Sequence, residues 1–236
     1  MIVIKRFAFL FALVFIIVAN SYATWSIIVI DSKTGAIGIA GASCTYSVYG
    51  IGAIIPGKGA IIVQAMSNSN ARVKGLQLML IDAPPEQIME AMKNPVFDPE
   101  EQQYAIICSK YAARPLTYTG TKTTSARGTL TSKGISVQGN TLSSEDELDA
   151  VLKAALQAQK DSLPIEEVLM LALEAGAKYG GDKRCGDRKA ASAFLTVANP
   201  SDHIKHPWLN LVVYGNNENI NAVEALRQKF NQWKNK

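Results

Sequence analysis

Strand-like segments come in groups along this chain, helix-like segments lie between the groups, and this order restricts the folds that the chain can adopt. Apolar, β-branched runs bounded by turn residues predict strands at 25–30, 36–43, 51–55, 60–65, 103–108, 116–119, 135–138, 190–197 and 209–214. Helical patterns are predicted at 71–81, 86–92, from 144, from 164 to 180, and at 222–233. Strand groups followed by helix pairs favour antiparallel sheets covered by helices, an α+β fold.

Two of these helices carry more detailed expectations. In 71–81, an apolar stripe with Val73, Leu76 and Leu80 is expected to face the core. In the helix from 144, Ser144 and Glu147 have the spacing of a capping box, so Ser144 is expected to cap the helix and Glu147 to complete the box.

The first residues have the pattern of a secretory signal peptide. Lys5 and Arg6 precede an unbroken apolar run over 7–19, and Ser21 and Ala23 are small residues at the positions that signal peptidase reads. The pattern predicts a signal peptide over 1–23, a single domain over 24–236, and a secreted or periplasmic protein with no membrane contact after cleavage. An uncleaved anchor is the alternative, although the run is shorter than the about 20 residues of a membrane helix.

The net charge restricts the kinds of binding partner, and the cysteine content predicts a disulfide. The formal net charge of +4 includes the two signal-peptide cations, and no basic run is interleaved with aromatics, so nucleic acid is not an expected partner. In an oxidising compartment, the simplest arrangement of the three cysteines is one disulfide and one buried thiol. All three pairings among Cys44, Cys108 and Cys185 are open. Cys185 lies among basic residues, and it is expected to form a disulfide, for which Cys44 is the candidate partner.

Metal and cofactor sites are not expected. The two histidines, His203 and His206, have a spacing that could hold a metal on a helix, but Pro207 follows directly and no nearby cysteine completes a site. No Gly-x-Ser-x-Gly elbow accompanies them, so a serine hydrolase triad is not predicted either.

Cleavage after Ala23 would make Thr24 the first residue of the mature chain. A threonine hydroxyl is a weak nucleophile until a base removes its proton, and an N-terminal threonine carries its own base, an α-amino group with a pKa near 8. Because a strand is expected to begin directly after Thr24, the sheet would hold this group in place.

Eight short motifs support this hypothesis by their order. They are Thr24-Trp25-Ser26-Ile27-Ile28-Val29, 31–35, 63–65 with Asn68, 75–76, 119–120, 137–140, 180–182 and 192–193. Together they resemble the pattern of the DUF1028 family, which has no known function and is similar in fold to the N-terminal nucleophile (Ntn) hydrolases. The resemblance covers nearly all of the mature chain and implies a four-layer αββα sandwich of the Ntn type, with the nucleophile at the start of a central strand.

The resemblance also implies roles for individual residues. Thr24 would be nucleophile and base, while Asn68, Gln138 and Asn140 would donate hydrogen bonds to an oxyanion or orient substrate, or alternatively form turns. Ser43 and Gln64 could contact the amine or only end strands, and Asp182 could support the site or cap a loop. A cation that lowers the pKa of the amine would come from Lys58, Lys183, Arg184 or Arg188.

The resulting hypothesis is an exported Ntn-type amidohydrolase that cleaves a small amide or peptide-like bond after signal peptidase has exposed Thr24. The alternative is a non-catalytic exported binding or surface-assembly protein that keeps the fold. Substrate and oligomeric state stay open.

Overall fold

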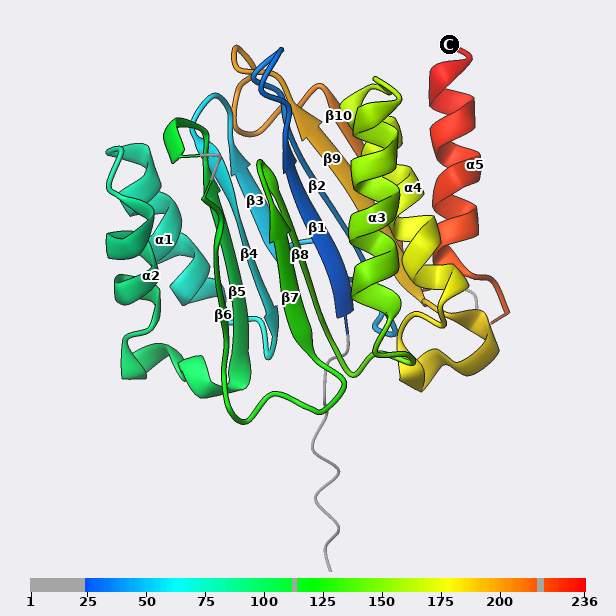
Figure 1. The fold of residues 1–236 in the computed structure, drawn as a ribbon, viewed down its shortest axis with the longest axis horizontal. Helices are drawn as coiled ribbons and strands as arrows, with labels where there is room; N and C mark the ends of the chain where they lie inside the picture. The colour runs from blue at the N-terminus through cyan, green and yellow to red at the C-terminus, as the bar shows by residue number, and fades with distance from the viewer. Residues whose placement is uncertain (1–23, 112–113, 216–218) are drawn as a thin grey trace, which may run out of the picture.

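The protein is a mixed α+β structure with two antiparallel sheets and helices on their outer faces (Figure 1), as the order of elements predicts. The computed structural model describes residues 24–111, 114–215 and 219–236, so the predicted signal peptide lies outside the described residues. The six-stranded sheet runs β10 (Leu209–Val213), β9 (Ser192–Ala198), β2 (Ile37–Ser43), β1 (Thr24–Ile30), β8 (Ile135–Asn140) and β7 (Gly128–Ser132). The four-stranded sheet runs β3 (Gly52–Ile55), β4 (Gly59–Ala65), β5 (Gln102–Cys108) and β6 (Leu116–Thr119).

Helices cover both outer faces. The pair α1 (Ser69–Leu80) and α2 (Pro85–Met92) packs on the four-stranded sheet, whereas α3 (Glu147–Lys160), α4 (Ile165–Lys178) and α5 (Ala222–Lys234) pack on the six-stranded sheet. Four short 3₁₀ helices join the elements: η1 (Pro95–Phe97), η2 (Pro99–Glu101), η3 (Ser109–Tyr111) and η4 (Lys183–Arg188). No helix within the described ranges is long and apolar enough to cross a membrane.

The central strand β1 is buried on both faces, which explains its near-continuous apolar sequence. Successive side chains point to opposite faces of a sheet. Trp25, Ile27 and Val29 therefore join the apolar cluster under α3, α4 and α5, while Ile28 and Ile30 join the cluster between the two sheets. By the same alternation, Thr24 and Ser26 face the opposite sheet.

The structure corrects the expectation for α1. Of the predicted stripe, Leu76 packs partly buried against the core, whereas Val73 and Leu80 are 48% and 49% exposed. The buried residues are Ala71, Gly75 and Met79. The reason is close packing: a Cβ on Gly75 would lie 2.7 Å from Ile61 Cδ1 of β4, so the small residues Ala71 and Gly75 are buried on this face, together with Met79. The stripe is predicted from side-chain hydrophobicity, but the narrow space between α1 and β4 admits only a small residue at Gly75.

The expected capping box of α3 is also wrong. The helix begins at Glu147, the Ser144 hydroxyl accepts a hydrogen bond from the Asp146 amide at 3.2 Å, and Glu147 is fully buried instead of capping. One strand, β7, was not predicted at all, because its polar residues at the edge of the sheet resemble a turn region.

Candidate active site

Thr24 is the first residue of β1 and lies in the middle of the six-stranded sheet. It pairs with Ser43 at the end of β2 and with Asn140 at the end of β8, and it is 3% exposed. Because both neighbouring strands pair with β1 at this residue, the position of Thr24 is set by the sheet. Asn140 is therefore part of a strand, and the alternative that it forms a turn does not hold.

Polar side chains join the two sheets directly beside Thr24. The Ser26 hydroxyl donates to Gln64 Oε1 at 2.5 Å and accepts from Gln138 Nε2 at 2.7 Å. Gln64 Nε2 donates to the Thr24 carbonyl at 3.4 Å. Two of the predicted residues, Gln64 and Gln138, are thus brought to the nucleophile candidate, where their amides position the start of β1.

Gln103 on β5 is the centre of this network, and the sequence did not point to it. Its Oε1 accepts from Gln64 Nε2 at 2.9 Å and from Asn140 Nδ2 at 3.0 Å, and its Nε2 donates to the Gly139 carbonyl at 3.0 Å. Asn140 Oδ1, although buried, has no hydrogen-bond partner in the described part of the chain. An unused acceptor therefore lies on the strand beside Thr24.

A cavity of about 510 Å³ opens at this end of the sheet. Thr24 and Ser43 line it, together with the loop after β2, the residues 65–67 after β4, and Arg72 of α1. Ala65 and Ser67 have left-handed backbones, with φ of +66° and +46°, a strained geometry that often occurs at functional sites. Two other cavities, of about 450 and 660 Å³, are lined neither by Thr24 nor by the polar side chains beside it.

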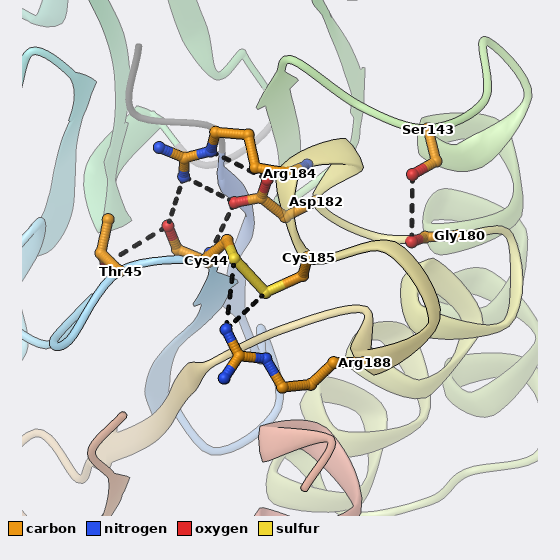
Figure 2. The surroundings of a disulfide bond; sticks show 9 residues. Cys44, Thr45, Ser143, Gly180, Asp182, Arg184, Cys185 and Arg188 are labelled. Carbon is orange, nitrogen blue, oxygen red and sulfur yellow. Dashed lines mark hydrogen bonds and ion pairs between the residues drawn. A yellow bond between two sulfur atoms is a disulfide. The ribbon is translucent and has the colours of Figure 1, made fainter. Parts of the chain in front are cut away.

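The residue after β2 is covalently linked to η4 (Figure 2). Cys44 and Cys185 form a disulfide, with their Cα atoms 5.5 Å apart. The buried Asp182 carboxylate accepts from the Cys44 amide at 2.5 Å and forms an ion pair with Arg184 at 2.7 Å. Asp182 also caps η4 by accepting from the Arg184 amide. It therefore acts as a structural support beneath the site and does not face the cavity.

Among the candidate cations, Arg184 lies nearest to the strand pair. Its Nη2 lies 3.5 Å from the Ser43 hydroxyl, and Ser43 is the cross-strand partner of Thr24. Lys58 instead pairs with Asp82 at 2.8 Å, and Arg188 lies against the disulfide sulfurs. Lys183 is exposed.

Asn68 is not brought to Thr24. Its Oδ1 caps α1 by accepting from the amides of Asn70 and Ala71, and its Nδ2 donates to the Phe97 carbonyl at 3.1 Å. Both ends of the side chain are therefore used in holding the start of α1. An asparagine directly before a helical pattern is an N-cap signal, and that signal fits this residue better than a catalytic role.

Glu147 is a second buried group that the sequence did not reveal. Burial and the nearby Asp182 carboxylate raise its pKa to about 9, against the opposing effect of the Gly181 and Ser143 amides. Those amides already donate to backbone carbonyls, so they stabilise the charged form only weakly. The Glu147 carboxyl is therefore neutral near pH 7.

The described residues contain no group of three or more side chains that could hold a metal ion. His203 and His206 pack ring against ring, with centroids 5.6 Å apart.

Comparison with known proteins identifies the family but no activity. The model of DUF1028, a family of unknown function, matches residues 24–223, a match that begins at the residue where β1 begins. A crystal structure of a DUF1028 protein from Silicibacter pomeroyi superposes with a TM-score of 0.74 at 22% identity, covering 89% of this chain and 88% of that one. At this identity the likeness shows the fold alone. No curated protein matches the chain.

Proposed function

The chain belongs to the DUF1028 family, whose function is unknown, and we propose that it is an exported amidohydrolase of the N-terminal nucleophile type with Thr24 as nucleophile. In this proposal the sheets and helices form the four-layer αββα sandwich of that class. Signal peptidase, cutting after Ala23, would create the catalytic amine. The substrate would be a small amide or peptide-like molecule.

One observation carries the proposal: Thr24 begins a central strand, is fixed by partners on both sides, and lines a cavity. A nucleophile requires both a rigid position and access for substrate. A residue at the end of a peripheral strand would lack the rigid position, and a residue in the middle of β1 would lack access for substrate.

The chemistry follows from the group that cleavage would create. The α-amino group takes the proton of the Thr24 hydroxyl, Oγ bonds to the carbonyl carbon of the substrate, and the C–N bond breaks as the leaving nitrogen takes that proton. The acyl group remains on Oγ as an ester. Water then attacks the ester, with the amine again as base, and releases the carboxylic acid and the free hydroxyl.

Asn140 supplies what the new amine requires. An amine N–H is a hydrogen-bond donor, and the unused Oδ1 of Asn140 is a buried acceptor on the strand that pairs with Thr24. This contact would orient the amine, while Ser43, on the other neighbouring strand, would flank it in the same cavity. The guanidinium of Arg184 beside Ser43 disfavours a charged amine and so favours the neutral base.

The test uses the exported full-length chain. N-terminal sequencing and intact mass should give Thr24 as the mature terminus, and a β-lactone should acylate Thr24 alone. Thr24→Ala should abolish labelling and Thr24→Ser should retain it, because a primary hydroxyl keeps the chemistry. Thr131→Ala, which removes an exposed hydroxyl on β7, is the matched control and should label like the parent.

Two results would contradict the proposal. A mature terminus other than Thr24 removes the catalytic base, as an uncleaved anchor would. A Thr24 terminus that reacts with none of several electrophiles would instead support the alternative, a non-catalytic exported binding or surface-assembly protein.

A further inference from the structure

The cavity beside Thr24 contains one charged side chain, Arg72. Among the described residues that line this cavity, all others are uncharged, and none is an aspartate or glutamate. Arg72 comes from the first turns of α1, which Asn68 caps and holds against the end of η1. Its guanidinium is thus delivered to the cavity by an anchored helix.

Arg72 is half-buried and has no partner in the described chain. It forms no ion pair, and its side chain makes no hydrogen bond with any described residue. Burial lowers its pKa, and no neighbouring carboxylate offsets this effect. An arginine stays charged in proteins, and a desolvated charge without a counter-ion is costly, so such groups are usually paired. The missing counter-ion is the observation that points to a ligand.

We propose that Arg72 binds a carboxylate of the substrate, so that the substrate class is an N-acyl amino acid or a short peptide with a free carboxylate near the cleaved amide. The planar guanidinium matches a carboxylate with two parallel hydrogen bonds. The inference rests on the proposed function, because it assumes that the molecule held by Arg72 is the one presented to Thr24.

The remaining wall of the cavity indicates the rest of this molecule. Val48 and Ile51 are buried, while Tyr49 and Met66 are 44% and 45% exposed. These four residues form the apolar and aromatic part of the lining of the cavity that Arg72 also lines. An amino acid with an apolar side chain would place its carboxylate at Arg72 and its side chain against this wall.

The test compares probes that differ only in the charged group. Binding of N-acetyl-leucine and N-acetyl-tyrosine, and of their carboxamides, is measured by calorimetry in the Thr24→Ala protein, which cannot consume them. We expect each carboxylate to bind about tenfold or more tightly than its carboxamide, because hydrogen bonds to charged groups are the stronger ones. Arg72→Gln should abolish this preference, and Arg72→Lys, which keeps the charge but not the fork, should retain part of it.

Lys74→Gln is the matched control, since it removes one positive charge from the exposed side of the same helix and should leave the preference unchanged. Equal binding of carboxylate and carboxamide, no binding of either carboxylate, or an unchanged preference in Arg72→Gln would each overturn the inference. The two proposals fail separately. Thr24 labelling without carboxylate preference refutes only the substrate class, and an Arg72-dependent preference without Thr24 labelling refutes only the catalytic role.

Discussion

Hydrogen-bonded polar side chains lie between the two sheets near the Thr24 end of β1. The neighbouring apolar cluster between the sheets consists of isoleucine, alanine, valine and one phenylalanine. The polar group consists of Ser26, Gln64, Gln103, Gln138 and Asn140, with Ser136 bonded to Gln138. Burying an amide without hydrogen bonds costs free energy, and a fully paired network instead fixes one geometry. The network therefore fixes the strands around Thr24. Within the part of the chain that the structure describes, it leaves one acceptor, Asn140 Oδ1, without a hydrogen-bond partner.

Glu147 is the residue whose environment departs furthest from that of the free side chain. Neither carboxyl oxygen has a hydrogen-bond partner among the described residues, and the raised pKa follows from burial first and from Asp182 second. A carboxyl whose pKa is raised on folding stabilises the folded state fully only below its unfolded pKa of about 4.3. As pH rises from there toward about 9, folding increasingly requires holding a proton that the unfolded chain releases.

Glu147→Gln keeps the shape of the side chain and removes the titration. We expect the two proteins to have similar stability at pH 4 and the variant to be more stable at pH 8, by about 1 kcal/mol or more. Urea unfolding at several pH values measures this difference. Glu145→Gln, at an exposed position two residues earlier, should leave the pH dependence unchanged. A difference between Glu147→Gln and the parent that is constant across pH would contradict the neutral carboxyl.

At the scale of elements, α4 is fitted to β1 at one glycine. A Cβ on Gly176 would lie 2.7 Å from Trp25 Cδ1, and Trp25 is the fully buried neighbour of Thr24. The helix can therefore approach the strand only because this position has no side chain. The contact links the packing of the helix layer to the start of β1.

Gly176→Ala separates packing from helix propensity. Propensity alone would stabilise the helix by up to about 1 kcal/mol. We expect destabilisation by about 1–3 kcal/mol instead, because the methyl group displaces the Trp25 ring in a closely packed core. Ala175→Gly, at the partly exposed preceding position, measures the effect of helix propensity alone. It should lower the free energy of unfolding by about 1 kcal/mol. An increase in the free energy of unfolding of Gly176→Ala would show that the ring moves without cost.

The elements differ in how well the sequence predicts them, for physical reasons. Buried strands such as β1 and β4 are predicted because they are apolar runs bounded by turns. The edge strand β7 is missed because half-exposed threonine and serine lack that contrast. The buried face of α1 is wrongly predicted at Val73 and Leu80, because packing against β4 selects Ala71 and Gly75 and hydrophobicity alone does not reveal that close approach.

The candidate site divides in the same way. Thr24, Ser43, Gln64, Gln138 and Asn140 were expected to be functional from a family resemblance, and the strand register brings them together. The sequence does not reveal Gln103 and Arg72, because a glutamine in a strand and an arginine in a helix are both common. Only the tertiary fold gives the Gln103 side chain five hydrogen-bond partners and leaves the Arg72 side chain without a partner among the described residues.

At the scale of the whole molecule, one covalent bond closes most of the chain into a loop. Cys44 follows β2 directly, Cys185 lies in η4, and 141 positions separate them. The bond attaches the segment after α4 to the strand beside Thr24. Cys108, the third cysteine, stays a buried thiol, and burial raises its pKa to about 11. Its thiol is therefore neutral and unreactive at physiological pH.

Loss of the disulfide should destabilise the protein through the unfolded chain. Closing a long loop restricts the unfolded ensemble, and removing such a native bond costs about 2–5 kcal/mol. We expect this loss in Cys44→Ser, in Cys185→Ser and in the double variant alike, since all three lack the same bond and the single effects therefore do not add. Urea unfolding measures the loss, and reduction of the parent protein should reproduce it. Cys108→Ala, which only shortens a core side chain, should cost less. If the single losses summed in the double variant, each cysteine would act through its own packing, and the disulfide would not be what holds η4 to the end of β2.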